Sequence, residues 1–321
     1  MRNISFKSNS KEDAIKVDNK INYGFKLFAG RYSRSISKNV VDNLANENID
    51  WNSSDFEDEI AAVCDCLMKN DPGIRRLNSY NCPLRKLLGD TVIMCYILLL
   101  IDKYNELTTN RSIELKGSNR KKFIVYSRIL LDKLVYEYSC SLWKGSSDSS
   151  LKTYLKNPTV VFTPVEKTQW DNLITEAYEY NEINGNPIKK NVLSVLTYYF
   201  SMLRNKSLDL EEDQSPQIDH IIPDATFTKE SSDIRFKDSL INFALLPPLL
   251  NNKKKANINS IEQIYLEEIC KLEDIDVDTI KQLNDPGSMT LLKEKRSFII
   301  DDVKDKRDSF VRAEKTWGIN I

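Results

Sequence analysis

The chain contains a single histidine, His220, and this limits the chemistry available to it. A Ser-His-Asp or Cys-His enzyme would have to use His220, and a metal site with two histidine ligands cannot be built from this chain alone. An imidazole with an ordinary pKa of about 6.5 can accept a proton at neutral pH. Asp219 directly precedes the histidine and offers a carboxylate. The pair suggests a general base beside a hard oxygen ligand.

Amide and lysine side chains follow at positions that suit a divalent cation and a phosphate. Asn242 opens the sequence NFALL, and Asn251 follows later, just ahead of Lys253, Lys254 and Lys255. A carboxylate and an amide oxygen form a sparse ligand set that suits Mg²⁺, with Mn²⁺ possible, because Mg²⁺ keeps several waters and binds substrate phosphate. The three lysines supply positive charge for a phosphodiester. The combination predicts phosphodiester hydrolysis.

Short strands and a short helix must position these residues. The sequence predicts a strand over Gln217–Pro223, ended by its proline, and a second apolar stretch over Leu240–Leu246. A proline pair and a short basic helix follow. Because neighbouring residues of a strand point to opposite faces, Asp219 and His220 can serve one site only where the strand is distorted or ends.

The rest of the chain has helical patterns. The apolar run Thr91–Ile101 is about half of the roughly 20 residues that a membrane span needs, so it predicts a buried helix. Lys122–Trp143 predicts a central helix buried on most sides. Thr163–Glu166 is a capping box that predicts a helix beginning at Pro164. Gly145–Ser150 is the best candidate for an internal linker.

Composition narrows the class further. Lys and Arg total 46 and Asp and Glu total 47, so the formal charge is −1 and nucleic-acid contact would need a local basic patch. The chain has no glycine-rich phosphate loop. Its six cysteines lack paired CxxC spacing, which favours reduced thiols. With no apolar signal segment at the start, we expect a cytoplasmic protein that does not enter a membrane.

These patterns predict a mainly α fold with a small α+β core, in which a helical scaffold surrounds a ββα unit. We expect an N-terminal helical domain over residues 1–145, a helical lead-in over 151–207, the ββα core over 208–260 and a C-terminal helical extension over 261–321.

The segment D-H-I-I-P, then N-x-x-L-L, then Asn251 followed by lysines, resembles the ββα-metal motif of HNH endonucleases. It is most similar to the nuclease half of GmrSD-type modification-dependent restriction enzymes, and the match covers about Ile218 to Asn257. The resemblance implies that His220 is the general base and that Asp219 and Asn251 are metal ligands. It also implies that Asn242 holds the loop and orients the histidine through a hydrogen bond.

The resemblance implies a metal-dependent endonuclease that cuts DNA in restriction or anti-phage defence. The family's NTP-hydrolysing half carries a DGQQR-like motif that this chain lacks, so we expect a companion protein that supplies NTP hydrolysis or recognition. Three alternatives stay open. Asn252 could be the ligand in place of Asn251, RNA could be the substrate, or the chain could be a catalytically idle DNA-binding or scaffolding subunit.

Overall fold

The computed structural model of the chain is mainly α-helical, as the sequence predicted, and its described part contains one small antiparallel sheet. The structure describes residues 23–46, 55–77, 82–108, 114–143, 147–178, 190–204, 216–228, 231, 233–256, 261–283 and 286–313.

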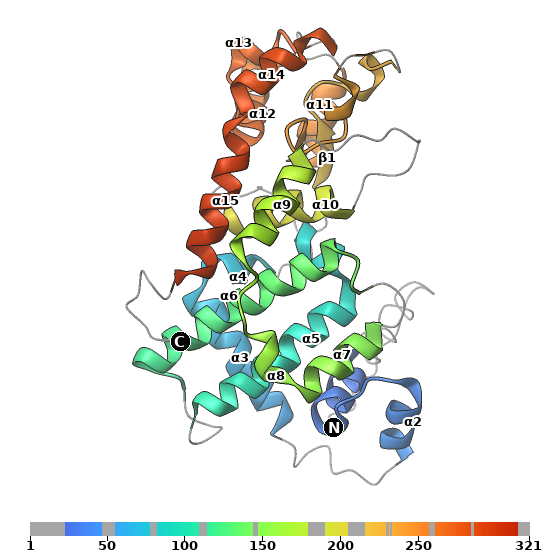
Figure 1. Cartoon of the computed structure of the whole chain (residues 1–321), viewed down its shortest axis with the longest axis vertical. Coiled ribbons are helices and arrows are strands. Elements are labelled where there is room, and N and C mark those ends of the chain that lie inside the picture. Colours follow the sequence, from blue (N-terminus) through green and yellow to red (C-terminus); the bar gives the residue numbers. More distant parts are fainter. Residues whose placement is uncertain are drawn as a thin grey trace.

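Helices α2 to α8 gather at one end of the molecule, the sheet, α11 and α12–α14 gather at the other, and α9 and α10 lie between them (Figure 1). After a helix over 23–33, the elements are α2 (Lys38–Asn46), α3 (Phe56–Asn70), α4 (Pro72–Leu77), α5 (Pro83–Leu107), α6 (Gly117–Ser139), α7 (Ser147–Lys156), α8 (Pro158–Val161), α9 (Lys167–Tyr178), α10 (Lys190–Tyr198), the π-helical turn η1 (Tyr199–Leu203), β1 (Gln217–His220), η2 (Asp224–Thr226), η3 (Ile234–Phe236), β2 (Phe243–Leu246), α11 (Pro248–Ala256), α12 (Gln263–Glu273), α13 (Val277–Ile280), η5 (Pro286–Ser288), α14 (Met289–Arg296) and α15 (Phe298–Val311).

The two longest helices, α5 and α6, form the centre of the larger helical group. The apolar run Thr91–Ile101 lies inside α5, and the side chains from Leu98 to Ile101 are fully buried, which confirms the predicted buried helix. The predicted central helix is confirmed as α6, although it begins and ends a few residues earlier than expected. In the described part of the chain, no helix has both the length and the apolar character needed to cross a membrane.

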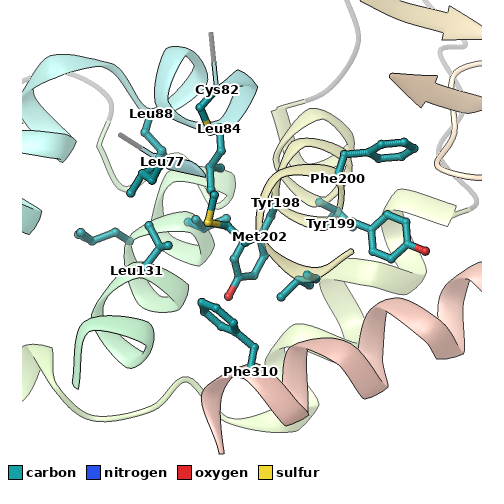
Figure 2. Packing of buried hydrophobic residues seen from close by; sticks show 14 of the residues in the cluster. Leu77, Cys82, Leu84, Leu88, Leu131, Tyr198, Tyr199, Phe200, Met202 and Phe310 are labelled. Carbon is teal, nitrogen blue, oxygen red and sulfur yellow. The ribbon is translucent and has the colours of Figure 1, made fainter. Parts of the chain in front are cut away.

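The segment from α10 into η1 joins the two ends of the molecule. Its side chains Tyr198 and Met202 are buried, and the ring of Tyr198 meets that of Phe310 of α15 edge to face, with 6.1 Å between ring centroids (Figure 2). Helix α15 runs back from the sheet end to pack on α9 and α6 (Figure 1). Helix α15 therefore connects the sheet end to the helical core.

A buried ion pair reinforces this connection. Asp132 of α6 has no exposed surface and accepts hydrogen bonds from Trp170 Nε1 (2.9 Å), Tyr198 Oη (3.0 Å) and two nitrogens of Arg307 (3.0 and 2.6 Å). These residues come from α6, α9, α10 and α15. The carboxylate of α6 thus accepts hydrogen bonds from three other helices.

Two boundary predictions were wrong. Helix α7 begins at Ser147, so four of the six residues of the predicted linker are helical. Helix α9 begins at Lys167 rather than Pro164 because the segment before it is held in another conformation. The Val165 carbonyl accepts a hydrogen bond from Arg307 Nη2 (3.0 Å), and the Glu166 N–H donates to the side chain of Gln169 (3.3 Å), which satisfies the helix start there.

Gly30 marks a close contact between the first helix and α5. A Cβ atom at this position would lie 2.5 Å from Leu98 Cδ1 and 3.2 Å from Ile36 Cγ2, and both neighbours are buried. We expect Gly30→Ala to lower the free energy of unfolding by about 1–3 kcal/mol through overpacking. Gly24→Ala in the same helix is the matched control, because nothing lies within 4 Å of its added Cβ. Urea unfolding compares the two, and equal stability of both variants would contradict the overpacking.

The sheet consists of β1 and β2, with α11 directly after β2. The strands pair antiparallel, with Asp219 opposite Ala244 and His220 opposite Phe243. Strand β2 is fully buried, whereas β1 is partly exposed. The strand ends at His220 rather than continuing to Pro223, and α11 confirms the short helix predicted after the proline pair.

Candidate functional site

Strand β1 presents its polar side chains to two different surroundings. The side chain of Asp219 pairs with Lys254 of α11, whereas that of His220 pairs with Asp238 in the loop before β2. This is the alternation of a regular strand. His220 is the last residue of β1, and its backbone carbonyl accepts a hydrogen bond from Lys254 Nζ (3.2 Å). The two sets of side chains therefore meet at the end of the strand.

Asp219 and Glu273 enclose the ammonium group of Lys254. Lys254 Nζ contacts Asp219 Oδ2 and lies 2.8 Å from Glu273 Oε1, where α12 ends. With the His220 carbonyl, all three N–H donors of the ammonium have acceptors. The Asp219 side chain is 6% exposed and that of Lys254 8% exposed, so water screens this pair poorly.

The pKa values of these groups reflect their burial and mutual contact. Burial alone would lower the pKa of Lys254, but the carboxylates of Glu273 and Asp219 raise it above its ordinary value, so the group stays an ammonium. Burial raises the pKa of Glu273 to about 7; Lys254 opposes this shift and Asp219 adds to it. Two carboxylates thus share one ammonium in direct contact.

Asn251 lies on the same side of β1 as this ion pair. Its Nδ2 donates to the side-chain oxygen of Gln217 (2.6 Å), two positions before Asp219 on the strand. Asn251 is 1% exposed, and its Oδ1 has no hydrogen-bond partner among the described residues. Its neighbour Asn252 is exposed. Of the two asparagines considered from the sequence, Asn251 is the one that contacts β1, at Gln217, on the strand face that also carries Asp219.

His220 is held by a carboxylate and an aromatic ring. His220 Nε2 lies 2.8 Å from Asp238 Oδ1, and the imidazole packs edge to face on Phe243, with 4.7 Å between centroids. Burial alone would raise the pKa of Asp238, but its hydrogen bonds with His220 and Lys237 lower it below its ordinary value. Because an ionised carboxylate only accepts, Nε2 carries the proton and Nδ1 has the lone pair. The imidazole is 23% exposed, so solvent reaches it.

Lys237 and Asp224 complete this more open side of the site. Lys237 Nζ lies 2.5 Å from Asp224 Oδ1 and 3.1 Å from Asp238 Oδ2. The Asp224 side chain is 58% exposed. Potential ligand atoms of His220, Asp224 and Asp238 lie within 4.8 Å of one another, a set that could also hold a metal ion. Here too a lysine ammonium already bridges the carboxylates.

Asn242 fixes the loop around the histidine without contacting its ring. Its Oδ1 accepts from the Ile222 N–H (2.8 Å), and its Nδ2 donates to the carbonyls of Ile222 (3.2 Å) and Lys237 (2.9 Å). The hydrogen bond to the imidazole, which the resemblance assigned to Asn242, is made by Asp238 instead. Asn242 lies after the loop, where its side chain reaches only backbone groups on either side.

The three lysines expected to contact phosphate differ in their surroundings. Lys254 is buried in ion pairs with Asp219 and Glu273, so in this structure its ammonium does not face solvent, as a contact with phosphate would require. Its place three positions after Asn251 turns it toward β1. Lys253 is 40% exposed, lies 3.6 Å from Glu262 and stacks over Tyr265. The side chain of Lys255 lies outside the described part of the structure.

Sequence reasoning missed the partners that complete both sides of the site. Asp224 and Asp238 lie at the two ends of a polar loop that carried no motif, although both are carboxylates close to the predicted strands. Glu273 lies far outside the matched segment and gave no signal. Its approach to Asp219 depends on how α12 packs on the sheet, which no local pattern records.

The C-terminal helices also contact the hairpin formed by β1, its loop and β2. Arg296 of α14 is fully buried, and its Nη1 donates to the carbonyl oxygens of Ile241 and Phe243. Burial lowers the pKa of Arg296 to about 10, against the opposing effect of Asp274 and Glu273. At the residue directly after α12, Arg204 pairs with Asp274 at 2.9 Å.

Comparison of the chain with protein-family models, curated proteins and solved structures finds no match.

Proposed function

We propose that the protein is a metal-dependent endonuclease of the HNH type that hydrolyses phosphodiester bonds of DNA. The observation that carries the proposal is the order and contact of three elements. The only histidine ends β1, β2 pairs with β1, and α11 directly after β2 turns Asn251 toward the strand face that carries Asp219. A defence setting follows from the sequence resemblance alone.

The chain's own groups can perform the proton transfer. His220 Nδ1 takes a proton from the attacking water while Nε2–H stays bonded to Asp238, which stabilises the imidazolium that forms. Water oxygen then bonds to phosphorus as the bond to the leaving sugar oxygen breaks, and Asn242 keeps the loop in place. Asp238 thus acts as a positioning residue, which the sequence did not indicate.

The donor set near Asp219 suits a divalent cation. Asp219 and Asn251 offer oxygen ligands, the Asn251 oxygen lacks a partner among the described residues, and the neighbouring carboxylates already enclose a cationic group. Mg²⁺ held there, or Mn²⁺ in its place, would stabilise negative charge on the phosphate.

Metal binding gives the first test of this proposal. At a cation concentration about 100 times Kd, binding to the folded state adds about 2.7 kcal/mol of stability, which raises the melting temperature by several degrees. We expect Mg²⁺ and Mn²⁺ to produce such a shift in the wild type and in Asn252→Ala, but not in Asp219→Ala or Asn251→Ala. If Asp219→Ala still shows the melting shift, the metal does not bind at this site, and the group of His220, Asp224 and Asp238 is the next candidate.

One observation favours a second function, that of a catalytically idle DNA-binding or scaffolding subunit. Lys254 already neutralises Asp219, so this face of the sheet can be stable without a metal ion. An idle subunit would show neither a metal-linked melting shift nor cleavage.

Digestion of duplex DNA, single-stranded DNA and RNA in parallel identifies the substrate of an active nuclease.

We propose a companion protein that supplies NTP hydrolysis or recognition. Efficient, site-selective cleavage by the purified chain without NTP would remove the need for that partner.

A further inference from the structure

The group formed by Asp219, Asn251, Lys254 and Glu273 contains more oxygen ligands than the sequence motif provides. Asp219 comes from β1 and Asn251 from α11, but Glu273 comes from the end of α12, beyond the matched segment. All three ligand-type side chains are at least nine-tenths buried. We infer that Glu273 is a third protein ligand of the proposed divalent-cation site, and that the Lys254 ammonium occupies this place when no cation is bound.

Two oxygens of this group lack hydrogen-bond partners among the described residues. They are Glu273 Oε2 and Asn251 Oδ1, and both are buried. A buried polar atom without a partner costs about 1–3 kcal/mol, so each of these two oxygens has an unmet capacity for a donor or a cation. Lys254 uses its three donors on Asp219, Glu273 and the His220 carbonyl and has none left for them.

The charges of Asp219, Glu273 and Lys254 also bear on the occupant of this place. Once Glu273 has lost its proton, Asp219 and Glu273 together carry one more negative charge than Lys254 neutralises in direct contact. Arg296, whose charge also interacts with Glu273, directs its hydrogen bonds to the Ile241 and Phe243 carbonyls. A divalent cation in place of the ammonium would balance both carboxylates, and Mg²⁺ and Mn²⁺ prefer such oxygen ligands.

The lysine and the cation are therefore alternative occupants of one place. Both need the Asp219 and Glu273 oxygens, and a cation among these oxygens would repel the ammonium. Lys254 would then leave the carboxylates as the metal binds. This inference rests on the proposed function for the presence of a metal. It assigns Glu273 of α12 as a further ligand and Lys254 of α11 as a competitor for the same oxygens.

Calorimetric titration of the full chain with MnCl₂ tests both parts, with Mg²⁺ as a second probe. We expect Glu273→Gln to weaken Mn²⁺ binding at least 10-fold, because the amide keeps the shape and loses the charge. We expect Lys254→Met to strengthen it at least 10-fold, because the competing cation is gone. Glu262→Gln and Lys253→Met are the controls, since this pair is more exposed and lies 3.6 Å apart; both should bind as the wild type does.

Melting curves supply a second measurement that is independent of nuclease activity. Lys254→Met should melt lower than the wild type without metal, because two buried carboxylates lose their partner, and Mn²⁺ should restore much of that loss. A larger Mn²⁺-induced rise in melting temperature for Lys254→Met than for the wild type supports the shared place. A folded Lys254→Met protein that Mn²⁺ neither binds nor stabilises overturns the inference.

The outcomes separate this inference from the proposed function. If Asp219→Ala and Asn251→Ala lose Mn²⁺ binding while Glu273→Gln binds as the wild type does, Glu273 is not a ligand and the endonuclease proposal stands. If neither the wild type nor Lys254→Met binds Mn²⁺ or Mg²⁺, both the inference and the metal-dependent nuclease are wrong.

Discussion

Replacing His220 with alanine is expected to reduce DNA cleavage by about 100- to 10,000-fold, the usual contribution of a general base. No second histidine exists in the chain to take over proton transfer. The imidazole is partly exposed and packs mainly on Phe243, so its loss should leave the fold and DNA binding largely intact. Cleavage under single-turnover conditions, together with a DNA-binding measurement, checks both parts of this expectation.

Ile218→Ala is the matched control for this substitution. Ile218 lies two positions earlier on the same face of β1 and is 37% exposed, so its truncation changes the surface of the strand without removing a proton acceptor. We expect it to cleave like the wild type. Equal cleavage by His220→Ala and the wild type would refute the assignment of the base.

Arg307→Ala is expected to give the largest loss of stability, about 3–5 kcal/mol in the free energy of unfolding, because it leaves the buried Asp132 carboxylate without its cation. The remaining donors, Trp170 and Tyr198, are neutral. Urea unfolding followed by circular dichroism measures the change. Lys306→Ala, one position earlier in α15, removes a more exposed pair with Asp302 and should cost only about 0.3–0.5 kcal/mol.

The pH dependence of Arg307→Ala provides a further check. Burial already raises the pKa of Asp132, and the hydrogen bonds and charge of Arg307 oppose that shift. Without the arginine, the folded-state pKa rises further above the unfolded value of about 3.9. The unfolded chain then releases its proton at lower pH than the folded chain, so stability falls as the pH rises between the two values. We expect the deficit to be smaller at pH 5 than at pH 7; a deficit that grows on acidification would contradict this account.

Local patterns predicted most elements near the candidate site. Strands were expected at the DHIIP and NFALL segments, and the proline pair predicted the start of α11, because each pattern depends on neighbours in sequence. The helix boundary at Lys167 could not be predicted in this way. It depends on a hydrogen bond from Arg307, which is more than a hundred residues away in the chain.

In the site too, residues that belong to a local sequence pattern could be predicted, whereas partners that tertiary packing brings in could not. The motif brought out Asp219, His220 and Asn251, whose types and spacing are visible in sequence. It could not indicate that Asp238 holds the imidazole or that Glu273 contacts Lys254, since both contacts depend on tertiary packing. The burial of Lys254 has the same origin: a lysine in a basic run is ordinarily solvated, and here two distant carboxylates bind it.

The Arg296 contacts with the hairpin carbonyls bear on how this region could be dissected or moved between proteins. A fragment cut after α11 would leave the carbonyl oxygens of Ile241 and Phe243 without that donor and Lys254 without one of its two acids. Gene fusions and chimaeras that aim to transplant the hairpin should therefore carry the chain through α14, because a truncation or frameshift before Arg296 would remove this donor from the hairpin.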